Sequence, residues 1–283
     1  MVHRDGKFKN HKYTLERFET INEFIREMEA RPITPQYKDN HTARSVRSYI
    51  EEPGWAGAST YEEAKDMFLN GTKAKAEMRK AFASEIDPHR KKIETGICGC
   101  APIVPNALLG IPQAMIDVKH RRVPKAIRVV VNMSISASTS AREITEAGKK
   151  IIAAVGKLES QGVSTEILCT SDKEIGHGRE QVISSCSIAI KNAGQAFNAA
   201  RVSFSMSSPA FLRVFQFIHT SSQPEIPYDG GYGRAISYGF SREELSEYYR
   251  TMYGNGVYIS LADVTRYGQS EIDRAINAWK SGK

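Results

Sequence analysis

The feature of this sequence that most constrains its fold is the apolar run at residues 127–133, which contains three consecutive valines. Such a run, without the polar alternation of a half-exposed strand, is typical of a strand covered on both faces in a largely parallel sheet. A polar segment at 134–140 follows it. Beyond that segment, apolar residues recur at three- or four-residue steps: Ile144, Ala147, Ile151, Val155 and Leu158. This spacing predicts a long amphipathic helix that Gly162 ends, and thus the first strand, loop and helix unit of a wound α/β fold.

Four further strands are expected on apolar, β-branched or aromatic content, at 165–169, 181–190, 201–206 and 257–261. The second and third strands should pair antiparallel because the connection between them is short. Helices are predicted after Pro209 and from the capping serines Ser241 and Ser270. We therefore predict an α/β core at residues 126–283, with a mostly parallel wound sheet and helices on both faces.

Residues 1–125 are expected to form a helical and extended N-terminal arm that packs on this core. Helix-capping patterns occur at 20–23 and at 59–63, while glycines and prolines interrupt residues 96–125, which we interpret as a linker or extended wrap. Three large apolar residues, Trp55, Tyr61 and Phe68, are predicted to pin the arm to the larger body.

The composition places the chain among globular proteins. Of its 283 residues 41% are hydrophobic and 25% are charged, and its longest apolar run falls well short of the roughly 18 residues that cross a bilayer. Its polar N-terminus carries no pattern of a secretory signal, so we expect a cytoplasmic protein that does not bind membranes. The four cysteines are expected to be free thiols, with Cys169 and Cys186 buried as small hydrophobic residues.

The positive net charge of +7 is concentrated in two segments. Residues 73–92 hold seven Lys or Arg against three acidic residues, and residues 119–128 hold no acidic residue. The basic residues of the second segment are Lys119, Arg121, Arg122, Lys125 and Arg128. Clustered cations of this kind are either a solvated surface or a site for a polyanion, so nucleic-acid binding, with possible nuclease activity, is one candidate function.

The loop after the first predicted strand carries Asn132, Ser134 and Ser136. This spacing resembles the Asp-x-Ser-x-Ser motif of von Willebrand factor type A domains, in which an aspartate and two serines hold a divalent cation. The resemblance implies a type A-like fold and a Mg²⁺ or Mn²⁺ site at these three residues. Since asparagine replaces the anionic ligand, we predict a degenerate site that holds no required cofactor, with a serine-rich helix cap as the alternative.

The chain also resembles uncharacterised phage and prophage proteins. The resemblance is carried by residues 55–57 and 61–64, by the segment Val-Pro-Asn-Ala-Leu-Leu-Gly-Ile-Pro at 104–112, and by residues 208–213 and 230–233. It implies a viral origin, with action in the host cytoplasm or in the virion, and implies no reaction.

Motifs of common enzymes are missing from the sequence. It has no nucleophile elbow, no phosphate-binding loop and no dinucleotide fingerprint, and its seven histidines are scattered. His177, between two glycines near Asp172, is the histidine best placed for acid–base work, but we favour a polar hairpin loop as its explanation. We therefore expect a non-catalytic role.

Six tyrosines lie within 26 residues of the C-terminal third: Tyr228, Tyr232, Tyr238, Tyr248, Tyr249 and Tyr253. Tyrosine-rich surfaces are common at protein interfaces, and Tyr228 and Tyr232 in a glycine-rich loop could also stack on a base. The sequence thus favours a binding or assembly protein that uses a protein partner or self-association, with nucleic-acid binding as the alternative.

Overall fold

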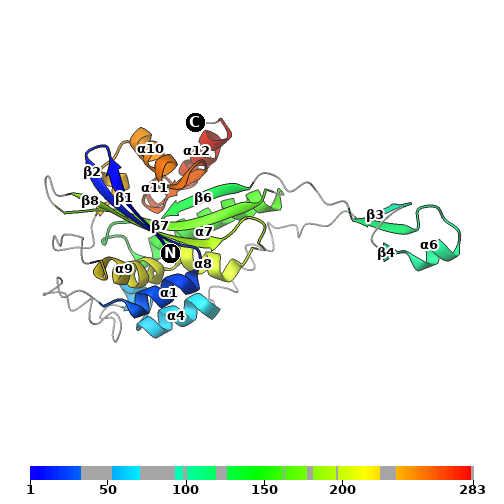
Figure 1. The fold of residues 1–283 in the computed structure, drawn as a ribbon, viewed down its shortest axis with the longest axis horizontal. Coiled ribbons are helices and arrows are strands. Elements are labelled where there is room, and N and C mark those ends of the chain that lie inside the picture. Colours follow the sequence, from blue (N-terminus) through cyan, green and yellow to red (C-terminus); the bar gives the residue numbers. More distant parts are fainter. Residues whose placement is uncertain are drawn as a thin grey trace.

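The computed structural model describes residues 1–32, 53–70, 93–97, 101–118, 126–161, 163–176, 181–195, 197–223 and 234–281. Within these ranges the chain forms a body built on one sheet and a small unit of its own at residues 93–118 (Figure 1). The statements below concern these residues.

The central sheet has the strand order β1-β2-β8-β7-β6-β10, with β9 added beside β7. Its strands are β1 (Val2–Phe8), β2 (His11–Phe18), β6 (Ile127–Asn132), β7 (Thr165–Ile175), β8 (Val182–Lys191), β9 (Arg234–Ala235) and β10 (Val257–Ser260). β6 pairs parallel with both β7 and β10, β2 pairs parallel with β8, and β7 pairs antiparallel with β8. The predicted α/β class, with parallel strands at the centre and the antiparallel β7–β8 pair, is confirmed.

Both faces of the sheet are covered, but unequally. One face packs against many helices: α1 (Ile21–Ala30), α4 (Tyr61–Asn70), α7 (Ala141–Ser160), α8 (Ala199–Ser207), the π-helix η2 (Phe211–Gln216), α9 (Phe217–Ser221), α11 (Leu261–Tyr267) and α12 (Gln269–Lys280). The other face packs against α10 (Arg242–Tyr253) and the short η3 (Ile236–Tyr238). β6 is therefore buried on both sides, as its valine run predicts.

Helix α7 begins and packs as its sequence predicts. Ser140 and Glu143 form a reciprocal capping box, and the apolar stripe from Ile144 to Leu158 faces the core. Gly148 is required for the approach of α8, because a Cβ atom there would lie 2.2 Å from the carbonyl oxygen of Met206.

One predicted strand is wrong. Residues 201–206 lie in helix α8. Val202, Phe204 and Met206 alternate with serines, which imitates the period of a strand. In the structure Ser203 and Ser205 are buried as well, so the helix shows no polar stripe by which its period of 3.6 could have been detected.

The N-terminal residues contribute two strands that the sequence-based prediction missed. β2 pairs with β8 over seven register partners, and β1 extends the sheet as a hairpin partner of β2. The expected anchoring contacts are confirmed, since the Trp55 ring of the short helix α3 (Pro53–Ala56) lies 5.9 Å from that of Phe217 and Tyr61 and Phe68 pack on Phe215. The division of the chain at residue 125 stays a prediction.

The predicted linker is wrong where the structure describes it. Strands β3 (Ile93–Gly96), β4 (Ala101–Pro102) and β5 (Met115–Val118) form a three-stranded antiparallel sheet with helix α6 (Val104–Leu108). We call residues 93–118 the spur, because Figure 1 shows them projecting away from the body. Pro105 stands in the first turn of α6, where its missing N–H costs no hydrogen bond, so prolines here begin a helix instead of breaking one.

Candidate functional site

Asn132 and Ser134, the first two residues of the predicted metal loop, are buried and bonded within the protein. The Asn132 side-chain oxygen accepts the backbone N–H groups of Ser134 (2.9 Å) and Asp172 (3.2 Å), and its amide donates to the Tyr249 hydroxyl (3.0 Å). The hydroxyl groups of Ser134 and Ser171 lie 3.1 Å apart. Asn132 thus joins β6 to β7 through its side-chain oxygen and to α10 (Arg242–Tyr253) through its NH₂ group, a role that needs both ends of an amide.

Ser136, the third residue of that loop, lies in the turn before α7. Its hydroxyl group is 2.8 Å from that of Ser138. Among the residues that the structure describes, no group of three or more His, Cys, Asp or Glu side chains is placed to hold a metal ion.

Asp172 lies at the centre of a buried cluster of hydroxyl groups between β7 and α10. Its carboxylate accepts hydrogen bonds from Thr170 (2.5 Å), Tyr253 (2.6 Å) and Tyr248 (3.3 Å). Burial raises the pKa of Asp172, and the hydroxyl donors oppose that shift. No described Lys, Arg or His forms an ion pair with it, so the hydroxyl groups alone stabilise its charge.

The tyrosine cluster divides in the structure. Tyr248, Tyr249 and Tyr253 are buried on the sheet and hold Asp172 and Asn132, so the expectation that they belong to a surface is wrong for these three. The i, i+4 pattern of apolar and tyrosine residues on α10 could have indicated a buried face. Tyr238 is 48% exposed. Tyr228 and Tyr232 lie outside the described residues.

The basic candidates are mostly outside the described residues as well, including Lys119, Arg121, Arg122, Lys125 and the segment 73–92. The structure describes Arg128, and its side chain is bonded within the protein. Its guanidinium group donates to both carboxylate oxygens of Glu166, at 2.9 and 3.2 Å, and to the backbone carbonyl of Tyr253. Arg128 therefore joins β6, β7 and α10 and is not a free cation for a polyanion.

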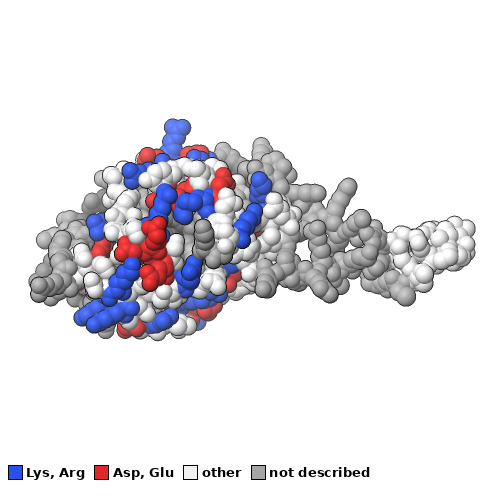
Figure 2. Space-filling view, turned by 90° about the horizontal axis from the view of Figure 1, so that it is seen from above, with Lys and Arg blue, Asp and Glu red and all other residues white. Residues whose placement is uncertain are grey.

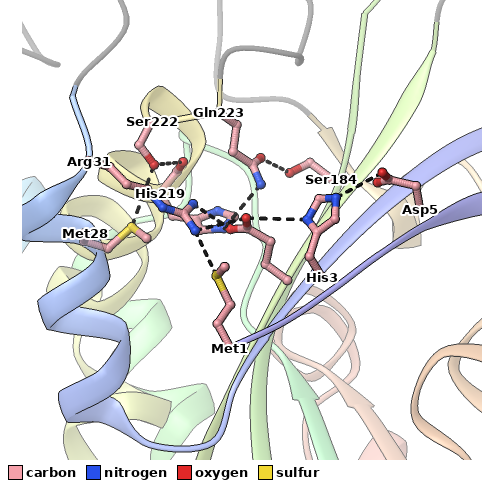
Figure 3. A network of polar contacts seen from close by, with 10 residues as sticks. Met1, His3, Asp5, Met28, Arg31, Ser184, His219, Ser222 and Gln223 are labelled. Carbon is pink, nitrogen blue, oxygen red and sulfur yellow. Dashed lines mark hydrogen bonds and ion pairs between the residues drawn. The ribbon is translucent and has the colours of Figure 1, made fainter.

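A second buried polar cluster, which the sequence-based prediction missed, lies on the opposite face of the sheet, between β2 and the end of α9. Glu16 accepts from Arg31 through both carboxylate oxygens (2.8 and 3.1 Å) and lies 2.8 Å from the Nε2 atom of His219. Figure 3 shows His219 of α9 together with Arg31, which follows α1, and Gln223, which follows α9, pointing towards one another, with His3 and Asp5 of β1 beside them. His219 and Glu16 are almost completely buried.

The electrostatics of this cluster fix its protonation. Burial raises the pKa of Glu16, but hydrogen bonds from His219 and Arg31 outweigh it and hold the pKa at about 2. Burial also lowers the pKa of His219. A neutral imidazole has one N–H group and a carboxylate can only accept, so Nε2 carries the proton and donates it to Glu16.

Lys173 is buried on the same face of the sheet as Glu16. Its ammonium group donates to the Thr220 hydroxyl (2.5 Å), and no described carboxylate pairs with it. Burial lowers its pKa to about 8. The adjacent thiol of Cys186 is buried and free, as predicted, and burial raises its pKa, which makes it a weak nucleophile.

The spur has the opposite character, since several of its large apolar side chains are exposed. Leu108 is 82% exposed, Ile97 77% and Leu109 75%, and Val104 and Ile111 are also exposed. None of the spur residues that the structure describes belongs to either core cluster. Residues 95–116 contain no charged residue, and Figure 2 shows the described end of the spur without Lys, Arg, Asp or Glu, whereas the body carries both signs.

The fold and these sites define a class: a mixed α/β domain with polar clusters sealed on both faces of its sheet and an uncharged apolar projection. No helix in the described part of the chain is long and apolar enough to span a membrane. The chain belongs to the family described as a domain of unknown function, DUF7192, whose model matches residues 5–275. The match includes the spur as well as the body. No curated protein and no solved structure matches the chain.

Proposed function

We propose that this chain is a phage-encoded, non-catalytic binding or assembly protein with a degenerate type A-like core and no required cofactor, acting in the host cytoplasm or the virion. The observation that carries the proposal is the exposed apolar surface of the spur. In this proposal the protein acts by docking the spur onto another protein, and the body supports the spur.

The energetics of the spur support this role. A small antiparallel sheet needs a buried hydrophobic face for independent stability, and the described part of the spur contributes no residue to the core of the body. Several large apolar side chains exposed within one small unit are a feature of interaction sites on proteins. Burying the leucine pair alone would contribute roughly 3–6 kcal/mol, because a fully buried leucine side chain is worth about 1.5–3 kcal/mol.

The arrangement of the body supports a type A-like core. The strand β6, the helix α7 that follows its loop and the antiparallel β7–β8 pair occur in the sequence order that a type A-like core would have. The position of the family's aspartate is taken by Asn132, whose amide donor and acceptor are both used in structural hydrogen bonds. A helix-covered sheet with no acidic ligand at this loop suits a scaffold for binding.

We expect the double substitution L108S/L109S to weaken association strongly without unfolding the body. Light scattering over a concentration series and capture from extracts of infected cells, quantified by mass spectrometry, measure binding to itself and to other proteins. Association should fall at least tenfold in this variant. Leu69→Ser is a matched control, since Leu69 is an exposed leucine of the body. A wild-type chain that stays monomeric and captures no protein through its spur would contradict the proposal.

Nucleic-acid binding is a second candidate, based on the five Lys or Arg residues without an acid at 119–128 and on the basic segment 73–92. Phosphate contacts release counterions, so binding should weaken steeply with salt. Gel shifts with a short duplex between 50 and 200 mM salt test this, with the variant K119A/R121A/R122A/K125A as the comparison. If the wild-type chain gives no shift at the low salt concentration, this candidate is wrong.

A further inference from the structure

We infer that Lys173, buried between the sheet and α9, is a modification site at which carbon dioxide adds to the side-chain amine and forms a carbamate. The modification would belong to the body and would be independent of the binding that we propose for the spur. Three features favour it: the surroundings of the amine, a buried amide without a partner beside it, and the complementarity of a carbamate to that amide.

The Lys173 amine is buried without a counter-ion. Its side chain points from β7 towards α9, and the residue is only 4% exposed. The Nζ atom donates one hydrogen bond, to the Thr220 hydroxyl at 2.5 Å, and no carboxylate among the described residues pairs with it. Since an ammonium ion buried in this way is costly, the site favours the neutral amine.

The neutral amine is the form that reacts with carbon dioxide. Burial lowers the pKa of Lys173 from its ordinary value of 10.5 to about 8. Near pH 7.5 roughly a quarter of the Lys173 side chains are then neutral, against roughly one in a thousand for a lysine with the ordinary pKa. The titratable groups that act on this amine are the Cys186 thiol of β8, the His219 ring of α9 and the Asp172 carboxylate on the other face of the strand.

Gln216 supplies the unpartnered amide. It ends the π-helix η2 and is completely buried, and neither its Nε2 nor its Oε1 atom has a hydrogen-bond partner among the described residues. Thr220, one turn later, accepts from Lys173 and donates to the Gln216 backbone carbonyl (2.9 Å). Burial raises the pKa of the Cys186 thiol, and the Gln216 amide and the Lys173 ammonium both oppose that rise, so both side chains converge on this thiol. Buried polar atoms left unpaired cost stability, which favours a partner for this amide.

A carbamate on Lys173 is complementary to the Gln216 amide. The planar carbamate carries an N–H donor beside an acceptor oxygen, and a primary amide carries an acceptor oxygen beside an N–H donor. The two groups can therefore form a pair of parallel hydrogen bonds, which satisfies both atoms of the amide. Carbon dioxide is small and uncharged, so local opening of the body is enough to admit it.

The reaction is an addition that needs no oxidant or reductant. The lone pair of the neutral Nζ atom forms a bond to the carbon atom of carbon dioxide, one carbon–oxygen π bond becomes an oxygen lone pair, and the nitrogen loses a proton to water. The products are a carbamate with one negative charge and a proton. Burial and the Lys173 ammonium both lower the pKa of His219, so replacing that ammonium with an anion should raise the pKa of this histidine.

Carbon-13 bicarbonate tests the site in the full chain. A carbamate gives its own carbon-13 NMR signal, and a trialkyloxonium salt traps it as a stable ester that mass spectrometry assigns to a peptide. We expect the trapped group on Lys173, with an occupancy that rises with the bicarbonate concentration. The exposed Lys150 of α7 is the internal control and should be modified roughly a hundredfold less, because fewer of its side chains are neutral.

Two variants separate the roles of the amine and the amide. Lys173→Met removes the amine but keeps an unbranched side chain, so the signal should disappear. Gln216→Leu should lower the occupancy roughly tenfold because two hydrogen bonds are lost. Gln161→Leu, at an exposed glutamine after α7, is the matched control and should leave the occupancy unchanged.

The trapped peptide identifies the modified lysine in the wild type, so the test does not depend on the folding of a variant. A wild type that gives no bicarbonate-dependent signal overturns the inference, and a buried water molecule is then the partner of Gln216. Equal modification of Lys150 and Lys173, or a signal that persists in Lys173→Met, overturns it as well. If Gln216→Leu keeps the occupancy of the wild type, the pairing with the amide is wrong.

Discussion

Replacing Glu16 with alanine is expected to lower the free energy of unfolding by roughly 3–5 kcal/mol at pH 7, because it leaves buried partners without their anion. Arg31 would lose two hydrogen bonds and the N–H group of His219 would lose its acceptor in a site that excludes water. Urea denaturation of the wild type and the variant at a series of pH values measures the difference.

The difference in the free energy of unfolding between the wild type and Glu16→Ala should become smaller as the pH falls. The pKa of Glu16 is about 2 in the folded protein, below the ordinary value of 4.5. Its contribution to stability, roughly 3 kcal/mol by linkage, is therefore fully present above about pH 4.5 and is lost as the pH falls towards 2. The lowered pKa of His219 acts in the same direction, since protonation of its buried ring below the ordinary value of 6.5 favours unfolding.

Asp5 provides a comparison within the same network. It is exposed on β1 and pairs with His3 at 3.0 Å, and exposed pairs contribute at most about 1 kcal/mol. Asp5→Ala should therefore leave the midpoint of denaturation almost unchanged. If Glu16→Ala were as mild as Asp5→Ala, water would reach the Glu16 cluster, and the description of it as sealed would be wrong.

The parts of the fold that were predicted correctly are those set by local sequence. The valine run of β6, the capping box and stripe of α7, and the capping box of α10 each lie within a few residues of the features that specify them. The spur was predicted to be a linker because prolines and glycines interrupt its sequence, although its helix and strands accommodate them. Helix α8 was misread because its buried serines concealed the helical period.

The candidate sites were less predictable because tertiary structure assembles them. Glu16 and His219 are separated by 203 positions, and Asp172 and Tyr253 by 81, so no spacing along the chain brings them together. The strand β2, which carries Glu16, was not predicted, and without it the polar residues of 216–223 had no expected partner. The Asn132 loop was found from its motif, but its hydrogen bonds within the protein depend on β7 and α10.

Both polar clusters bear on the proposed role of the body as a support for the spur. Glu16 joins the first strands to the helices below the sheet, and Asp172 joins the sheet to α10. Buried polar groups that are fully bonded specify one arrangement of the elements around them. Elements of the body that are held in one arrangement lose less conformational entropy when the protein binds a partner.

Substituting Asp172 with alanine is expected to cost at least about 3 kcal/mol, because three buried hydroxyl groups would lose their acceptor and a small cavity would remain. Asp172→Asn keeps the shape of the side chain and should cost much less.

The two Asp172 substitutions should also differ in their dependence on pH. Burial raises the pKa of Asp172 above its ordinary value of 3.8, so ionisation in the folded protein costs stability; that cost is absent below about pH 3.8 and grows as the pH rises through the folded pKa. Asp172→Asn should therefore gain stability relative to the wild type between pH 4 and pH 8. Asp66→Ala, at an exposed position of α4, is the control. The effects of Tyr253→Phe and Asp172→Ala on stability should be less than additive when combined, because both substitutions remove the same hydrogen bond. If the effects of Tyr253→Phe and Asp172→Ala on stability are additive, the carboxylate is solvated and α10 is held by its apolar contacts alone. The same conclusion follows if the wild type becomes more stable relative to Asp172→Asn as the pH rises.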